Sequence, residues 1–182
     1  MQAQTLPAAA PAPHRAAADD GPSSLLRMAV GEEPLAVPID QVREILQVLR
    51  MTPLPRTPSF VRGVMNLRGS VVPVIDQAAR LGLPATVIGR RSCIVVVQTV
   101  EEHTDDGSTS VGSMGLLVDA VFEVFDRSAG EIEPAPVIGT LIPPQHLLGM
   151  TRASGRLIGV LALDRVLAAP DLAAAIAGFQ PH

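Results

Sequence analysis

Three aspartates each follow an apolar stretch, and they are the first candidates for chemistry: Asp76, Asp119 and Asp164. A carboxylate in such a position acts as a general acid or base when a histidine lies within reach. A small β-barrel hydrolase would combine Asp76 or Asp119 with the loop around His103 in a deep polar pocket. Ending a strand or capping a helix is the commoner role for each of these aspartates, so we treat the hydrolase as the rival hypothesis.

Neither a metal site nor a cofactor site can be assembled from the residue spacings. His103 lies near Asp105 and Asp106, but zinc needs three or four ligands fixed by a framework, and this stretch is polar loop. Cys93 has no second cysteine and lies in an apolar run, which indicates a small buried residue. The sequence contains no P-loop, dinucleotide-binding glycine pattern or nucleophile elbow. We therefore expect a protein that is not an enzyme and has no catalytic residue, metal or cofactor.

Two charged residues, Glu44 and Arg68, are embedded in apolar segments framed by turns. Each is either a solvent-facing charge or a contact residue, and the residues alone slightly favour the first explanation. A charge beside exposed Val or Leu on a rigid strand is also how protein interfaces are built. Surface recognition is thus the main alternative to catalysis.

Arg68 must be positioned by the segment 58–76. Thr57, Pro58 and Gly63 have the order of a capping hydroxyl, a first-turn proline and a closing glycine, which predicts one short helical turn. A tight hairpin follows with Arg68 at its tip, because Gly69 is free to adopt a positive φ. A short helix after Asp76 closes this segment.

Elsewhere, short apolar runs separated by turn residues predict about nine or ten strands and only brief helices. Residues 40–49 fit either a helix or a strand, since short apolar runs cannot be settled by period alone. We expect a long hairpin tip at 101–113, a strand or apolar arm at 137–142, a hairpin at Ser154-Gly155, and a helix capped by Asp164. This all-β pattern is typical of small barrels or a sandwich.

Composition narrows the partners. The chain has 182 residues, 47% of them hydrophobic, only 2% aromatic, and a net charge of −4. Nucleic-acid binding is disfavoured, because it needs a basic surface and aromatic platforms for stacking. No stretch has the length of a membrane span or the layout of a signal peptide, so we expect a soluble cytoplasmic protein. Residues 1–24 are rich in Ala and Pro and predict a disordered tail.

An ordered set of motifs resembles the CheW-type coupling proteins of bacterial chemotaxis. Each piece is short, but their order and spacing over residues 25–168 are specific. The matching pieces are LAVPI at 35–39, VREI at 42–45, FVRGVMNLRG at 60–69, VPVID at 72–76, GLLVDAVFEV at 115–124, IEPAP at 132–136, LGM at 148–150 and LALDRVL at 161–167.

The resemblance implies two small five-stranded SH3-like β-barrels, packed on a shared apolar core within residues 25–168, with a C-terminal helix and tail at 169–182. It implies a non-catalytic adaptor that joins the cytoplasmic tip of methyl-accepting chemoreceptors to the regulatory domain of a CheA-type histidine kinase. By motif position, Val42, Glu44, Arg68 and Val124 would lie at the receptor-binding groove. Arg68 would be a polar clamp, or Glu44 would orient it.

Some features depart from the family pattern, among them the long N-terminal tail, the polar stretch 101–113 and the pair Pro143-Pro144. They bear on the choice of partner more than on the fold. The chain could serve a pilus-driven, twitching-motility system instead of a flagellar one, or be a subunit of another complex.

Overall fold

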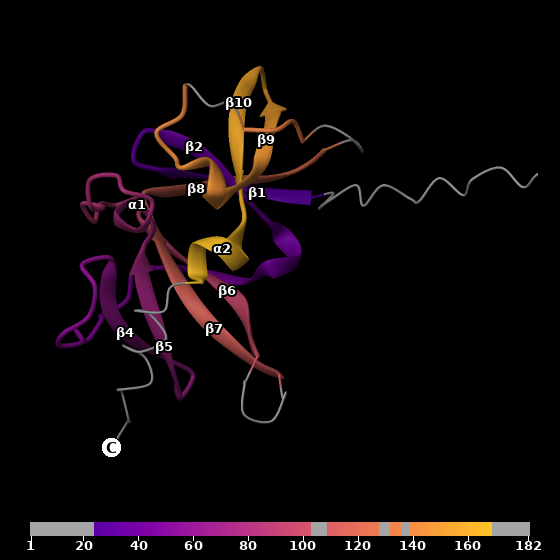
Figure 1. Ribbon diagram of the computed structural model, residues 1–182. Coiled ribbons are helices and arrows are strands. Elements are labelled where there is room, and N and C mark those ends of the chain that lie inside the picture. Colours follow the sequence, from indigo (N-terminus) through magenta and orange to yellow (C-terminus); the bar gives the residue numbers. More distant parts are fainter. Residues whose placement is uncertain (1–23, 103–108, 128–131, 136–138, 169–182) are drawn as a thin grey trace, which may run out of the picture.

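The computed structural model describes residues 24–102, 109–127, 132–135 and 139–168 (Figure 1). Strands dominate these residues. They are β1 (Ser24–Val30), β2 (Glu33–Pro38), β3 (Val42–Gln47), β4 (Val61–Leu67), β5 (Ser70–Asp76), β6 (Cys93–Glu102), β7 (Thr109–Val118), β8 (Ala120–Asp126), β9 (Leu147–Ala153) and β10 (Arg156–Leu161). The helices are short: η1 (Ile39–Gln41), α1 (Gln77–Arg80), η2 (Pro144–His146) and α2 (Leu163–Leu167).

The strands form two five-stranded sheets, which are drawn one above the other in Figure 1. Sheet A has the order β8-β1-β2-β10-β9, and sheet B has the order β3-β6-β7-β5-β4. The chain crosses between them twice, from β2 to β3 through η1 and from β7 to β8 at Asp119. Sheet B is therefore one continuous segment, whereas sheet A is assembled from the residues on either side of it.

Each sheet is closed into a barrel by one isolated bridge. Thr52, beyond the end of β3, exchanges two backbone hydrogen bonds of 2.8 and 2.9 Å with Val64 of β4. Glu133, beyond the end of β8, exchanges two of 2.8 and 2.7 Å with Met150 of β9. Each bridge links the segment after one edge strand to the opposite edge strand. The predicted all-β class with two small five-stranded barrels is confirmed.

One apolar cluster joins the two sheets. Burying such side chains is worth roughly 1.5–3 kcal/mol each, so this shared cluster holds the barrels together as predicted. Figure 1 shows α2 lying between the sheets, and α1 and α2 both contribute to the cluster. Its fully buried members include Met28, Leu35 and Val37 from sheet A, Ile75, Val95, Val97, Leu116 and Val118 from sheet B, and Ala78 and Val166 from the helices.

The helical turn predicted after Pro58 is wrong. Residues 59–60 form a simple turn, and β4 already begins at Val61. The Thr57 hydroxyl donates to the Leu54 carbonyl at 3.0 Å instead of capping a helix. Gly63 lies inside β4 with φ +135, and a Cβ there would collide with the Thr52 carbonyl of the closing bridge. The glycine serves barrel closure, which local sequence does not reveal.

The ambiguous segment 40–49 begins with η1 and continues as β3, so it is a strand after a turn, as the family resemblance implied. The predicted long hairpin tip at 101–113 is wrong for most of its length. The β6–β7 ladder continues to the pair Glu102↔Thr109, which leaves only 103–108 outside the described residues. Backbone pairing extended the strands through residues whose side chains are polar.

Two predictions near the C-terminus also change. Of the two alternatives for 137–142, the strand is excluded over 139–142, and 137–138 lie outside the described residues. The last short helix begins at Leu163 after Ala162, so Asp164 lies in its first turn and is not its cap. Of the tail predicted at 1–24, residues 1–23 lie outside the described residues and Ser24 already belongs to β1. The helix predicted after Pro170 also lies outside the described residues. Among the helices that are described, none is long and apolar enough to cross a membrane.

Candidate partner-binding site

Arg68 lies at the tip of the β4–β5 hairpin, as predicted. The pair Leu67↔Ser70 flanks a two-residue turn in which Arg68 has φ +52 and Gly69 has φ +88. Two left-handed residues in succession match the right-handed twist of the flanking strands. The Asn66 side chain accepts a 2.9 Å hydrogen bond from the Gly69 backbone N–H. The turn therefore holds the arginine backbone in one conformation.

The Arg68 side chain is paired with Glu44. Its Nη1 and Nη2 donate to the two carboxylate oxygens of Glu44 at 3.1 and 2.9 Å. The arginine side chain is 78% exposed, whereas the glutamate side chain is only 21% exposed. A bidentate pair fixes the plane of the guanidinium, and its remaining donors face solvent. The structure thus joins two of the four predicted site residues in one unit.

Val42 and Glu44 both belong to β3, the edge strand of sheet B. The ladder with β6 shifts between Val42 and Glu44, so Arg43 is an extra residue in a bulge. Val42 is half-buried and packs against the shared apolar cluster. Arg43 donates from Nη1 to the Ser113 hydroxyl of β7 at 2.6 Å. A bulge re-aims side chains on an edge strand, and here it sets Glu44 toward Arg68.

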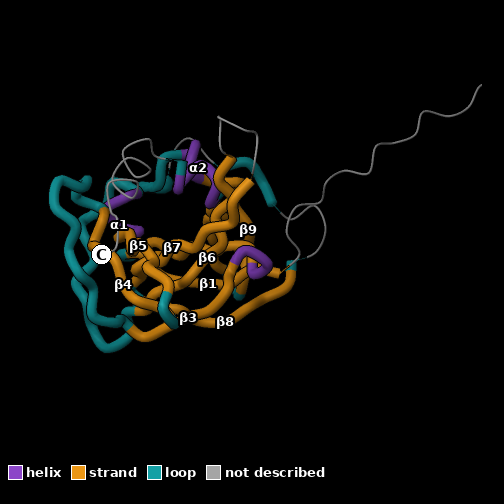
Figure 2. The backbone as a smooth tube through the Cα atoms, turned by 90° about the horizontal axis from the view of Figure 1, so that it is seen from below, coloured by secondary structure: helices purple, strands orange, loops and turns teal. Residues whose placement is uncertain are grey.

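Val124 lies in the other barrel, on the edge strand β8 opposite Leu26 of β1. Its side chain is 50% exposed, and the neighbouring Phe122 is similarly exposed. Figure 2 shows β3 and β8 along the same side of the molecule. The described contacts do not join Val124 to Glu44 or Arg68. Of the four predicted groove residues, Val42, Glu44 and Arg68 therefore lie on the barrel of sheet B, and Val124 lies on the barrel of sheet A.

Sequence reasoning missed a second ion-paired unit on sheet A. Arg27 binds both carboxylate oxygens of Glu123 at 2.7 and 3.0 Å and lies 4.3 Å over the Phe122 ring. A register shift between Leu26 and Met28 sets Phe122 and Glu123 together opposite Arg27. The hydrogen bond from Arg27 lowers the pKa of Glu123, and the same bond raises the pKa of Arg27. Only the strand register brings these residues together, since 96 positions separate Arg27 from Glu123.

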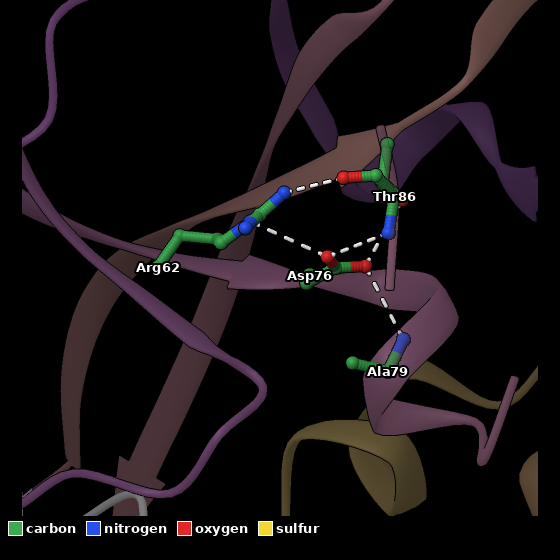
Figure 3. Close-up of polar contacts among 4 residues, drawn as sticks. All are labelled: Arg62, Asp76, Ala79 and Thr86. Atoms are coloured by element: carbon green, nitrogen blue, oxygen red, sulfur yellow. Dashed lines mark hydrogen bonds and ion pairs between the residues drawn. The ribbon is translucent and has the colours of Figure 1, made fainter. Parts of the chain in front are cut away.

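Asp76, proposed as a catalytic carboxylate in the rival hypothesis, is committed to structure (Figure 3). One oxygen accepts from the Ala79 N–H at 3.2 Å and the Thr86 hydroxyl at 3.0 Å, and the other accepts from the Thr86 N–H at 2.9 Å. The second oxygen also lies 3.3 Å from Arg62 Nε. The side chain is fully buried. Asp76 therefore caps α1, as its position predicted, and fastens a loop.

Asp119 is likewise structural. Its carboxylate accepts a 2.7 Å hydrogen bond from the Gly31 N–H in the β1–β2 turn, at the point where the chain changes sheets. His103 lies outside the described residues. Within the described ranges, no three His, Cys, Asp or Glu side chains gather where a metal ion could be held. Both named aspartates therefore accept hydrogen bonds from backbone N–H groups, and the geometry gives the hydrolase hypothesis no support at either one.

Comparison with known proteins settles the family. The profile of the CheW-like domain matches residues 24–171, which is most of the chain. The chain belongs to the CheW-like domain family. A CheW-like relative, the chemotaxis protein CheW of Rhizobium meliloti, is 35% identical over 156 residues, covering 86% of this chain and 94% of the relative.

Two further proteins extend the comparison. Protein FrzA of Myxococcus xanthus is 36% identical over 126 residues, covering 69% of this chain and 72% of the relative. The crystal structure of the scaffolding protein TtCheW from Thermoanaerobacter tengcongensis superimposes with a TM-score of 0.69 at 28% identity, covering 83% of this chain and 91% of that one. The two-barrel arrangement thus recurs in a solved CheW-like scaffold.

Proposed function

We propose that this chain is a non-catalytic adaptor that couples methyl-accepting chemoreceptors to a CheA-type histidine kinase in chemotaxis. Family membership and relatives named chemotaxis protein CheW support this function. The observation that carries the site is the Arg68–Glu44 pair, a guanidinium fixed at a rigid hairpin tip and largely open to solvent. The adaptor would act at receptor arrays, where many weak contacts add up to a stable assembly.

In this proposal the receptor's cytoplasmic tip contacts Arg68 as a polar clamp and Val42 and Val124 as apolar positions. Glu44 orients Arg68, because it is the more covered partner of the pair. A pre-oriented guanidinium loses little side-chain entropy when a partner carboxylate or carbonyl meets it. The kinase regulatory domain would bind elsewhere on the barrels.

A pilus-directed chemosensory system is the second candidate for the output. The similarity to FrzA, a relative with another name, supports keeping this alternative. The two outputs predict the same adaptor chemistry and differ in which receptor and kinase are bound. Binding assays with partners from each system would separate them.

The test is receptor-dependent activation of the kinase by the variant Arg68→Glu. We expect receptor affinity to fall about tenfold or more, as for an interface residue worth over 1.4 kcal/mol, with unchanged unfolding. Arg156→Glu is a matched control, since Arg156 is an exposed arginine beside the hairpin tip of the other barrel. Normal coupling by a folded Arg68→Glu protein would remove Arg68 from the site.

The double variant Glu44→Arg with Arg68→Glu separates contact from structure. It can reform the ion pair with inverted polarity. If Arg68 served only to hold the hairpin, the double variant would restore coupling. We expect it to remain defective, because the partner would then meet a carboxylate where it needs a guanidinium.

A further inference from the structure

The loop at residues 86–91, between α1 and β6, presents the most exposed aliphatic side chain in the described part of the chain. Val87 is 86% exposed, and its neighbour Ile88 is 47% exposed. An exposed valine on a flexible loop would need no explanation. This loop, however, is anchored to sheet B at one end and ends in a hydrogen-bonded turn at the other.

Thr86 supplies the anchor. Its N–H and hydroxyl both bind the buried carboxylate of Asp76, and its carbonyl accepts from Arg62 Nη2 (Figure 3). Thr86 itself is buried. All three polar groups of one residue are thus satisfied by two side chains of sheet B, immediately before Val87.

Ser92 closes a turn at the other end of the loop. Its hydroxyl accepts from the Gly89 N–H at 2.9 Å, and its own N–H donates to the Gly89 carbonyl at 3.1 Å. Ser92 is also buried. Val87 and Ile88 therefore lie between Thr86, which is anchored to sheet B, and a hydrogen-bonded turn at 89–92. An apolar contact made from such an ordered loop loses little conformational entropy on binding.

Two cations complete the loop. Arg90 and Arg91 are both exposed, and among the described residues neither guanidinium has a hydrogen-bond or ion-pair partner. The chain as a whole carries a net charge of −4. Two unpaired arginines beside two exposed aliphatic side chains complement a surface that offers carboxylates around an apolar socket.

The loop is well separated from Arg68. Arg68 lies just before the start of β5, whose first residue is Ser70. Asp76, which anchors the loop, is the last residue of β5. Seven residues at about 3.3 Å each place the two features about 20 Å apart, at opposite ends of one strand. A partner on this loop leaves the Arg68 end of the barrel free for another.

We infer that the 86–91 loop is a preformed docking element for the kinase regulatory domain. The face that it binds would carry carboxylates around an apolar pocket. This inference rests on the proposed function, since an adaptor must hold two partners without overlap. An anionic membrane surface is the weaker match. Each basic residue contributes only about 1 kcal/mol at such a surface, and the chain's net negative charge opposes it.

The experiment uses the full chain and measures binding to a CheA-type kinase regulatory domain and, separately, to a receptor-tip fragment. The variants are Val87→Ser with Ile88→Ser, and Arg90→Glu with Arg91→Glu. We expect each pair to weaken kinase binding about tenfold or more while receptor binding is unchanged. The arginine variant should also lose most of the salt dependence of kinase binding. Leu141→Ser and Arg156→Glu, at exposed positions outside the loop, are matched controls.

Thr86→Val tests the anchoring without altering the exposed surface. It keeps the shape of the residue but removes the hydroxyl that binds Asp76. We expect kinase binding to weaken severalfold, although no partner atom touches Thr86 in this arrangement.

The outcomes divide clearly. Unchanged kinase binding by both paired variants overturns the docking element and leaves the proposed function intact. Loss of receptor binding instead of kinase binding overturns it as well. Flotation with vesicles containing anionic lipid that depends on Arg90 and Arg91, with kinase binding intact, assigns the loop to a membrane and overturns the inference. A wild-type chain that binds neither partner removes the proposed function itself.

Discussion

The two barrels share a layout that the order of strands along the chain conceals. In each, an edge strand leads to a closing bridge, then to a hairpin whose second strand runs parallel to a central strand, and then to a short helix. In sheet B these parts are β3, Thr52, β4–β5 and α1, with β5 parallel to β7. In sheet A they are β8, Glu133, β9–β10 and α2, with β10 parallel to β2.

Small details repeat as well. A glycine immediately precedes the bridged residue in each barrel, Gly63 before Val64 and Gly149 before Met150. Each hairpin tip has two residues with positive φ, Arg68-Gly69 and Ser154-Gly155. Both barrels therefore use a glycine next to the closing bridge and a hairpin turn of two positive-φ residues.

The barrels differ in what their edges present. On sheet B the arginine of the ion pair is exposed and the glutamate is covered. On sheet A the polarity is reversed, since Glu123 is 50% exposed and Arg27 only 22%. The same scaffold thus offers a cation at one edge and an anion at the other, and the scaffold alone does not decide what binds.

The largest expected effect concerns the closing glycines. Gly63→Ala should lower the free energy of unfolding by about 3–5 kcal/mol, because overpacking and a strained positive φ add. Gly149→Ala should cost about 1–3 kcal/mol from overpacking against the Glu133 carbonyl and Ile132. Urea unfolding measures both. Gly69→Ala is the control, since that Cβ would meet no atom and only strain remains; equal effects at all three positions would contradict barrel closure as the cause.

Two aspartates should contribute differently to stability: Asp76, which binds the loop after α1, and Asp119, where the chain passes from one sheet to the other. Asp76→Ala should destabilise by about 3 kcal/mol, because it leaves buried donors of Thr86 and Ala79 unpaired beside Arg62. Asp119→Ala removes a single hydrogen bond to Gly31 and should cost about 1 kcal/mol. Urea unfolding of the two variants measures both losses of unfolding free energy. Similar values would mean that the Asp76 network adds nothing beyond one hydrogen bond.

His146, the last residue of η2, lies near the positive charge of Arg80 on α1. Burial lowers the pKa of His146, and the nearby Arg80 lowers it further. Arg80 lies on α1 and donates to the Val166 carbonyl of α2 at 2.7 Å, so it spans the two barrels. A lowered folded-state pKa favours the neutral form, so this stabilisation is complete above about pH 6.5 and is lost as the pH falls below that value.

We therefore expect the urea midpoint to fall between pH 7.5 and pH 5.5 in the wild-type chain, and to fall less in His146→Gln. The difference between the two slopes isolates this histidine from other titrating groups. Parallel slopes would show that His146 titrates alike in the folded and unfolded chain.

The smallest effects concern the two ion pairs. Arg68→Ala should change the unfolding free energy by less than about 1 kcal/mol, because exposed pairs contribute little. Arg27→Ala should cost more than Arg68→Ala, since Arg27 is largely covered and also packs on Phe122. Urea unfolding at low and high salt compares them. A larger cost for Arg68→Ala than for Arg27→Ala would mean that Arg68 is the more structural of the two arginines.

Local chemistry made parts of this fold predictable. Gly69 and Ser154-Gly155 identify hairpin tips, because only a few residues tolerate positive φ. Asp76 was correctly expected to end a strand and cap a helix. Arg68 and Glu44 were both singled out from their apolar surroundings, and the structure joins them. Val42 and Val124 rest on the family resemblance, and the partner-binding roles of all four residues stay predictions.

Contacts between distant segments were not predictable in this way. The role of Gly63 depends on Thr52, which approaches only when the barrel closes. The hydrogen bonds between Asp76 and Thr86 form only when the whole loop after α1 has folded back onto β5. Residues 101–102 and 109–113, which were expected in a hairpin tip, lie in strands because β6 and β7 supply each other's backbone partners.

By itself, the sequence determined that this chain forms many short strands and a hairpin with an arginine at its tip. Turn residues and alternating apolar residues specify such local structure within a few positions. Tertiary structure alone decided which strands share a barrel, which glutamate meets which arginine, and which loop is held still. Those outcomes depend on register and closure between segments tens of residues apart, where a shift of one position turns a side chain to the opposite face.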